Sequence, residues 1–258
     1  MSALESRTSN ASRGSQRMHT YVNGELFYLE LPDPNELLSI GVPWGEFDAL
    51  FTPAFWRGQA WQHHIQGHYL DNKLGRTLQE EMAACLLGGF GMPAAMGLAA
   101  FDRLRHFGLL KSDVEETHIL EALLEPLVIN GRLQRYRFPR QKAQHLASAL
   151  QQLEGIHQPE DDVALRDSLT SLPGIGLKTA SWIVRNHRGS NAIAIIDIHI
   201  LRAGRLAGIF PGAVEPANGY RTLEKLFLDF AYDLMVPASS LDALIWDYMR
   251  RLPLQLVT

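Results

Sequence analysis

The sequence predicts a mainly α-helical protein with one small β-hairpin near its N-terminus. Three observations lead to this fold class. Apolar side chains recur at helical spacing from about residue 76 almost to the end, Asn23-Gly24 separates two β-prone runs, and strands and helices do not alternate along the chain. At 258 residues, the chain is long enough for one large domain or for two lobes with a substantial core.

The N-terminal part divides into a tail and a compact segment. Residues 1–17 are rich in serine, arginine and asparagine, and we expect them to form a disordered tail. In residues 18–75, the run HTYVNGELFYLEL contains Asn23-Gly24, the strongest short signal for a hairpin. An aromatic-rich segment, residues 41–69, follows this hairpin, and most of its rings are expected to pack in a core.

The rest of the chain, residues 76–258, is predicted to be one helical domain. Glycine, proline and capping residues punctuate the apolar periodicity into separate helices. These are expected at residues 77–87, 93–106, 115–127, 139–153, 162–171, 177–187, 197–207, 217–231 and 239–251. The run AIAII, residues 192–196, is β-branched but leads directly into a helix, so we interpret it as a buried extended linker.

Composition limits the class of protein. No apolar run reaches the length needed to span a bilayer, and the N-terminus lacks the apolar region of a secretory signal. The single cysteine, Cys85, excludes an internal disulfide, a thiolate zinc site and a four-cysteine iron–sulfur cluster held within this chain. We therefore expect an intracellular protein, cytoplasmic and at the nucleoid if it is bacterial, with no membrane partner.

The charge is segregated along the chain. The net charge is −4, yet residues 130–153 contain no acidic side chain. The basic residues of this window are Arg132, Arg135, Arg137, Arg140 and Lys142. A one-faced binder of a polyanion requires such a distribution. Ordinary solvated helix faces are the alternative explanation for this window taken alone.

One stretch, SLPGIGLKTASWIVRN, carries the first chemical motif. A predicted helix runs into Leu-Pro-Gly-Ile-Gly and then into a second helix that begins near Lys178. Gly174 and Gly176 permit a tight turn and leave backbone N–H groups uncovered. Because those groups lie at a helix N-terminus, they can bind a phosphate without reading sequence. The pattern is typical of a helix–hairpin–helix motif.

A second motif, IIDIHILR, places Asp197 nineteen residues after Lys178. With this motif the sequence resembles the helix–hairpin–helix (HhH-GPD) DNA glycosylase superfamily, most closely its 8-oxoguanine DNA glycosylase/AP lyase branch. The resemblance covers roughly residues 76–251 and is strongest over 136–205. It implies a two-lobed helical HhH-GPD fold with its hairpin at residues 172–177. The polar early-helix motif of the ILSQQ type is not evident, because this chain has CLLGGFGMPAAMG there.

The resemblance also implies a reaction. A lysine directly after LPGxGx marks the bifunctional members, which remove a base and then nick the strand. The neutral amine of Lys178 would attack the sugar C1′, and the carboxylate of Asp197 would stabilise the developing oxocarbenium charge. A Schiff base would then permit β-elimination of the 3′ phosphate. The ordinary alternative is that Lys178 only contacts phosphate and Asp197 only caps its helix.

Further site residues follow from the same resemblance. The expected phosphate contacts are Gly174, Gly176, Thr179, His199 and Arg202. Trp182 lies four residues after Lys178 and so on the same helix face, where it could stack on a flipped base or pack in the core. Trp246 and Asp242, in LDALIWDYMR, resemble the terminal helix that closes the base pocket.

The expected partner is double-stranded DNA with a flipped damaged or modified base, with 8-oxoguanine favoured, bound by a monomer. No cofactor is expected apart from a possible Na⁺ or K⁺ ion at the backbone of Leu172 and Gly174. His64 and His68 do not suggest a zinc protease, since Ile65 replaces the glutamate of HExxH. Two other functions remain open: a non-catalytic helix–hairpin–helix DNA-binding module, and a glycosylase for a different modified base.

Overall fold

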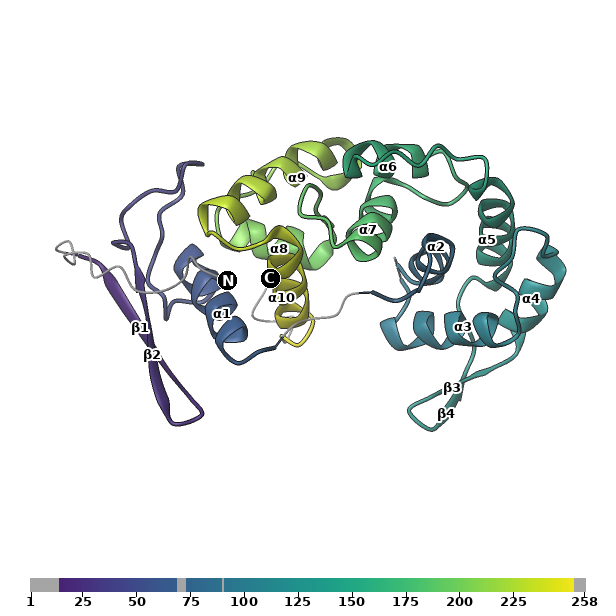
Figure 1. Ribbon diagram of the computed structural model, residues 1–258, viewed down its shortest axis with the longest axis horizontal. Coiled ribbons are helices and arrows are strands. Elements are labelled where there is room, and N and C mark those ends of the chain that lie inside the picture. Colours follow the sequence, from purple (N-terminus) through teal and green to yellow (C-terminus); the bar gives the residue numbers. More distant parts are fainter. Residues whose placement is uncertain (1–13, 69–72, 90, 253–258) are drawn as a thin grey trace. The chain divides into compact units, whose positions relative to one another are not determined.

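The computed structural model describes residues 14–68, 73–89 and 91–252, in which ten helices and two antiparallel two-stranded sheets are formed (Figure 1). The chain divides into two compact units. The first contains the described residues of 1–70, 198–214 and 225–258, and the second those of 71–197 and 215–224. No helix among the described residues is long and apolar enough to cross a membrane.

The first unit begins with the predicted hairpin. Strand β1 (Gln16–Val22) pairs with β2 (Glu25–Leu31), in register from Gln16 opposite Leu31 to Val22 opposite Glu25. Asn23 and Gly24 both have positive φ, 52° and 84°, as a type I′ turn requires. Because β1 starts at Gln16, the strand includes two residues that were assigned to the disordered tail; residues 1–13 lie outside the described residues.

Helix α1 (Pro53–Ile65) forms where the sequence predicted only an aromatic-rich segment. Thr52 caps it, and the Thr52 Oγ1 accepts a hydrogen bond from the Phe55 N–H at 3.0 Å. Phe55 and Trp56 are buried and pack edge-to-face against Tyr248 of helix α10 (Ala238–Met249). The aromatic rings therefore build a core, as expected, but they do so on a helix.

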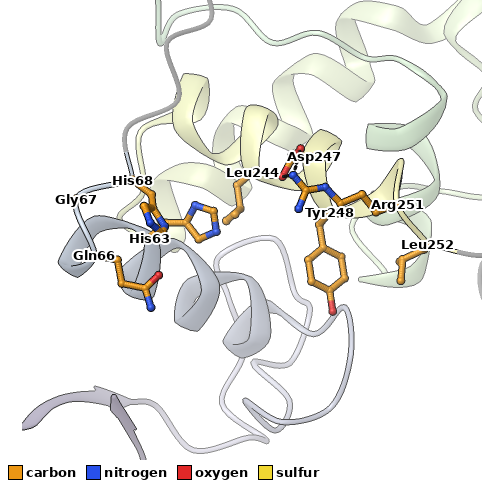
Figure 2. A pocket seen from close by; sticks show the side chains of 9 residues that line it. All are labelled: His63, Gln66, Gly67, His68, Leu244, Asp247, Tyr248, Arg251 and Leu252. Carbon is orange, nitrogen blue, oxygen red and sulfur yellow. Dashed lines mark hydrogen bonds and ion pairs between the residues drawn. The ribbon is translucent and has the colours of Figure 1, made fainter. Parts of the chain in front are cut away.

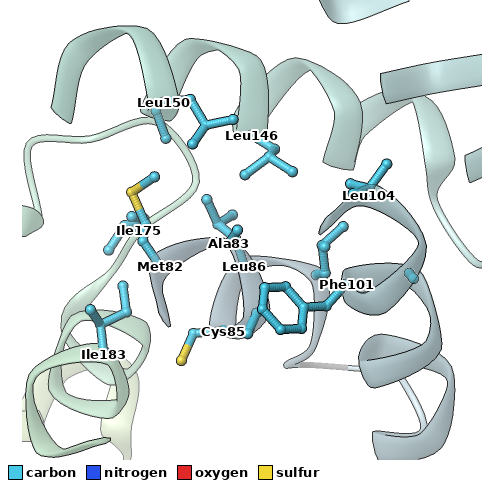
Figure 3. Close-up of a cluster of buried hydrophobic side chains, with 14 of the residues drawn as sticks. Met82, Ala83, Cys85, Leu86, Phe101, Leu104, Leu146, Leu150, Ile175 and Ile183 are labelled. Carbon is cyan, nitrogen blue, oxygen red and sulfur yellow. The ribbon is translucent and has the colours of Figure 1, made fainter. Parts of the chain in front are cut away.

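The second unit is built around helix α2 (Leu78–Leu87). This helix packs against α3 (Ala94–His106), α5 (Pro139–Leu153) and α7 (Leu177–Arg188). Its side chains from Glu81 to Leu87 are all buried, as in a helix surrounded by neighbours (Figure 3). Helices α4 (Glu116–Leu124) and α6 (Asp162–Leu169) complete the helical set that precedes α7.

A second hairpin, β3 (Leu127–Ile129) with β4 (Arg132–Gln134), was not predicted. The helix expected over 115–127 ends at Leu124, because Pro126 cannot donate a backbone hydrogen bond and the chain turns to extended geometry. Asn130 and Gly131 form the turn with φ values of 51° and 74°. Their conformation matches that of Asn23-Gly24.

Along helices α8 to α10 the chain passes from the second unit to the first, back to the second and again to the first. Helix α8 (Ile198–Leu206) starts one residue after Asp197, and α9 (Pro216–Asp233) has a non-helical residue, Gly219, in its first turns. Residues 215–224 group with the second unit, whereas α8, α10 and the rest of α9 group with the first. This grouping differs from the predicted single domain over 76–258, since its C-terminal helices join the N-terminal hairpin and α1.

Candidate active site

The hairpin between α6 and α7 is anchored by two apolar side chains. Leu172 and Ile175 are buried in the core, while Gly174 and Gly176 are exposed. The Ile175 N–H donates to the Leu172 carbonyl at 3.1 Å, which closes the turn. Gly174 has a φ of +77°, and a Cβ there would lie 2.4 Å from Nδ1 of His145 on α5. The turn therefore requires glycine at 174 for both its backbone conformation and its contact with α5.

The N-terminus of α7 is open at the residues predicted to bind phosphate. Gly176 is the N-cap residue, and a Cβ placed on it would meet nothing within 4 Å. The first helical hydrogen bond runs from the Ala180 N–H to the Gly176 carbonyl at 2.9 Å. The N–H groups of residues 177–179 consequently have no partner within the helix. These N–H groups lie at the N-terminus of α7, the positive end of the helix dipole, and this position favours the binding of an anion.

Lys178, in the first turn of α7, is half-buried and lies close to α2 and α5. Burial lowers the pKa of Lys142 on α5, and the positive charge of Lys178 lowers it further. The Lys142 Nζ donates to the carbonyls of Leu86 at 2.5 Å and Gly88 at 3.1 Å, at the C-terminal end of α2. Burial raises the pKa of the Cys85 thiol, and the charge of Glu81 raises it further by a smaller amount. The positive charge of Lys178 partly opposes this rise in the pKa. The charge of Lys178 therefore acts on groups of α2 and α5, and the helix that carries it packs against α2.

Trp182 packs against the same end of α2. A Cβ placed on Gly88 would lie 3.1 Å from Cη2 of the indole, so a side chain at this position would require the ring to move by a few tenths of an ångström. The ring is half-buried and rests on the hydrophobic core of the second unit. The structure thus shows the packing role that the sequence left open for Trp182, and a stacking role for the exposed part of the ring stays a prediction.

Asp197 ends an extended segment that two side chains of α9 hold in place. The Tyr220 hydroxyl donates to the Ala194 carbonyl at 2.8 Å and accepts from the Ile196 N–H at 3.2 Å. The Ala194 N–H donates to Glu224 Oε1 at 3.1 Å. Of the predicted buried linker 192–196, residues 193–196 are buried and outside any helix or strand, whereas Ala192 is exposed; Asp197 is half-buried immediately before α8. Burial raises the pKa of the Tyr220 phenol, so the hydroxyl stays protonated as the donor.

A buried ion pair joins this segment to both hairpin helices. Arg166 of α6 is 1% exposed and donates to both carboxylate oxygens of Glu224, at 2.9 and 2.7 Å. The Ser181 hydroxyl of α7 lies 3.5 Å from Glu224 Oε1 and from Arg166 Nη1. Arg166, Ser181, Tyr220 and Glu224, here called the buried network, therefore tie the helix of Lys178 to the segment of Asp197. Sequence reasoning missed all four, because the ion pair spans 58 residues without any local signal.

The other predicted site residues belong to the first unit. His199 and Arg202 lie on α8, which packs against α10, the helix that carries Asp242 and Trp246. The His199 ring approaches the Trp246 indole edge-to-face at 6.4 Å between centroids. Arg250 covers the same indole, 4.7 Å from its centroid. Asp242 is buried. The structure thus brings His199 and Trp246 together, as residues on facing helices.

A separate open pocket lies at the C-terminal ends of α1 and α10 (Figure 2). It has a volume of about 800 Å³, and none of the predicted site residues lines it. Burial and the neighbouring His68 lower the pKa of His63 in this pocket. Among the described residues, no group of three histidine, cysteine or acidic side chains is arranged to hold a metal ion.

Comparison with known proteins decides the family. The model of the family described as 8-oxoguanine DNA glycosylase matches residues 69–236. The chain belongs to this family. An 8-oxoguanine DNA glycosylase/AP lyase of Metallosphaera sedula is 28% identical over 159 residues, which are 58% of this chain and 72% of the relative. A Saccharolobus islandicus protein of the same name is 30% identical over 123 residues, 43% of this chain and 58% of that relative.

Solved structures confirm the predicted HhH-GPD fold. The crystal structure of the Methanocaldococcus jannaschii 8-oxoguanine DNA glycosylase aligns with a TM-score of 0.59 and 22% identity, over 76% of this chain and 94% of that one. A trapped endonuclease III–DNA covalent intermediate aligns with a TM-score of 0.54 and 18% identity, over 76% of this chain and 85% of that one. The mainly α-helical architecture of this glycosylase therefore agrees with both.

Proposed function

We propose that this glycosylase excises 8-oxoguanine from double-stranded DNA and then cleaves the strand at the abasic site, with Lys178 as the nucleophile. One observation carries this proposal. Within an 8-oxoguanine DNA glycosylase family member, the buried network ties the helix that carries Lys178 in its first turn to the segment that ends with Asp197. A module that only bound DNA would not need a lysine and an aspartate tied together in this way.

The chemistry assigns each side chain one task. The neutral Lys178 Nζ forms a bond to the sugar C1′ as the bond from C1′ to the base breaks. Positive charge develops on the sugar ring in this step, and the Asp197 carboxylate stabilises it. The C1′–O4′ bond then breaks, which opens the sugar ring, leaves O4′ as a hydroxyl and gives a protonated Schiff base. Loss of a proton from C2′ of this Schiff base expels the 3′ phosphate by β-elimination. Water finally releases the product and restores the amine.

The proposed contacts with the DNA backbone lie at the N-terminus of α7 and on α8. The open α7 N-terminus, with Gly174, Gly176 and Thr179, would bind a backbone phosphate, and His199 and Arg202 would add contacts. The Leu172 carbonyl keeps a lone pair beyond its bond to Ile175, which is compatible with a Na⁺ or K⁺ ion shared with Gly174. Trp182, Trp246 and Asp242 are the residues proposed to contact the flipped base. A monomer suffices for this reaction, which takes place inside the cell, where DNA is found.

Borohydride trapping tests the mechanism. The protein is incubated with duplex DNA that carries 8-oxoguanine opposite cytosine, and in parallel with abasic-site DNA, and covalent adducts are resolved on a gel. We expect an adduct with both substrates in the wild type and with neither in Lys178→Ala. Lys142→Ala is the matched control. This variant should still form the adduct, because the proposal does not use Lys142, the second lysine of the site, as the nucleophile.

Each other outcome has a distinct meaning. An adduct with abasic DNA alone would keep the lyase and assign the glycosylase step to a different modified base. An adduct that persists in Lys178→Ala would contradict the choice of nucleophile. DNA binding without any adduct would leave a monofunctional enzyme or a binding module.

A further inference from the structure

The β3–β4 hairpin has one face on the core and one face in solvent. Leu127 and Ile129 are buried, and β3 packs against α3. Val128 and Leu133 point the other way and face each other directly across the strands. They are 66% and 73% exposed. Figure 1 shows this hairpin projecting from the helices of the second unit. The β1–β2 hairpin carries a similar exposed pair, Tyr21 opposite Leu26, so the apolar pair alone does not identify a partner.

Positive charge surrounds this apolar pair. Arg132 on β4 and Arg135 just after it are exposed, as are Arg137 and Arg140 farther along. No aspartate or glutamate occurs between residues 130 and 153 to neutralise them within the segment. This surface is therefore complementary to a partner that carries repeated negative charge, and a nucleic-acid backbone has this property.

The hairpin is also tied to the border of the candidate active site. The chain after β4 is fastened at three points to the C-terminal end of α2 and to the loop that follows it. The Tyr136 hydroxyl donates to the Leu87 carbonyl at 2.6 Å, Arg137 donates to the Gly91 carbonyl at 2.7 Å, and Lys142 binds the carbonyls described above. Trp182 of α7 lies against this same end of α2, and Lys178 precedes it by about one turn on the same helix. DNA held at Lys178 would thus lie near the base of the hairpin.

We propose that the β3–β4 hairpin is a DNA-binding arm that holds the duplex beside the lesion. Arg132 and Arg135 bind backbone phosphates, and the Val128–Leu133 pair lies against deoxyribose in the groove. The turn of positive-φ Asn130 and Gly131 fixes the arm before binding, so little conformational entropy is lost. This inference rests on the proposed function for the identity of its ligand.

The salt dependence of DNA binding tests the arm. The probe is a duplex with a tetrahydrofuran abasic analogue, which binds but cannot be processed, and its Kd is measured from 50 to 200 mM salt. Each lost phosphate contact lowers the slope of log K against log salt by about 0.9. In Arg132→Ala/Arg135→Ala we expect the slope to fall by about 1.8, so that the affinity lost over this salt range is about 12-fold smaller than in the wild type.

A matched variant and a charge-preserving variant complete the test. Arg76→Ala/Lys111→Ala removes two exposed cations of the same unit outside the acid-free window, and its slope should equal that of the wild type. Arg132→Lys/Arg135→Lys should retain the wild-type slope. In Val128→Ser/Leu133→Ser we expect weaker binding with an unchanged slope.

Two results would overturn the proposal. A wild-type slope in Arg132→Ala/Arg135→Ala would show that the arm does not bind the duplex, and would point to a protein partner for the apolar pair. An equal loss of slope in the Arg76/Lys111 control would show that the effect is only net charge. Both results are distinct from failure of the proposed function, because the Lys178 adduct would still form.

Discussion

At the residue scale, Lys178 and Asp197 divide the chemistry between them, and this division can be measured. If Asp197 stabilises charge on the sugar, Asp197→Asn should slow base excision by about 10²–10³, as loss of a preorganised electrostatic partner does. Single-turnover cleavage of 8-oxoguanine DNA measures this rate. Because Lys178 remains, the adduct with abasic DNA should still form. Wild-type excision in this variant would remove Asp197 from the mechanism.

Gly174 provides a second residue-scale test. In Gly174→Ala, the new Cβ would meet His145 of α5 while the backbone stays at positive φ. We expect the free energy of unfolding to fall by about 1–3 kcal/mol, as strained backbone positions typically cost. Gly176→Ala is the matched control, since its φ is negative and the space around it is open. Equal stability of the two variants in urea denaturation would refute this explanation of the turn.

At the element scale, the buried network positions the Asp197 segment relative to the hairpin helices. Tyr220→Phe would leave the Ala194 carbonyl and the Ile196 N–H without their partner. Each buried backbone group left unpaired costs about 1–3 kcal/mol. We therefore expect lower stability and slower base excision, with the Kd for DNA nearly unchanged. Tyr232→Phe, on an exposed position of the same helix, should change none of these quantities.

The ion pair within this network predicts a larger loss of stability. Glu224→Ala would leave the Arg166 guanidinium buried without its main partner. Removing one member of a buried pair typically costs about 3–5 kcal/mol. Lys225→Ala removes the next side chain, which is exposed and pairs only with Asp229 at the surface, so it is the control. Similar unfolding midpoints for the two variants would contradict a structural role for the pair.

Elements with a regular local signal could be predicted from the sequence, and those without one could not. Asn23-Gly24 gave the first hairpin, and LPGIG gave the turn before Lys178. Helix α1 was missed because six consecutive residues from Pro53 to Gly58 are buried, which leaves no helical period to detect. The second hairpin carries the same Asn-Gly signal at Asn130 and could have been found. The Arg166–Glu224 pair could not, since only the tertiary fold brings its members together.

At the scale of the whole molecule, the two units are built from discontinuous segments, so no linker marks their boundary in the sequence. Glu81 contributes to the fold of the second unit. It is fully buried, and it accepts hydrogen bonds from the N–H groups of Leu74 and Gly75 and from the Asn186 side chain. These bonds connect the chain before α2 to α7. The free-energy cost of burying this carboxylate should therefore be measurable in the free energy of unfolding of the whole unit.

Burial raises the pKa of Glu81 above its usual 4.5, although its hydrogen bonds oppose the shift. The folded state therefore holds a proton at pH values where the unfolded state has released it. This contribution to the free energy of unfolding falls as the pH rises from 4.5 toward the folded-state pKa. Glu81→Gln should lack this part of the slope. Urea denaturation of both proteins across this interval measures the difference, and parallel curves would contradict the shift.

The position of Cys85 has a practical consequence for observing this enzyme. The thiol is fully buried in α2, its pKa is raised well above the usual value, and it is the only cysteine of the chain. Thiol reagents attack the thiolate, so they should leave the folded protein unmodified. A cysteine introduced by Gln134→Cys, at an exposed position of β4, would then be the single reactive site. A fluorophore attached there would report the arrival of DNA at the arm in real time, without any change to the native thiol.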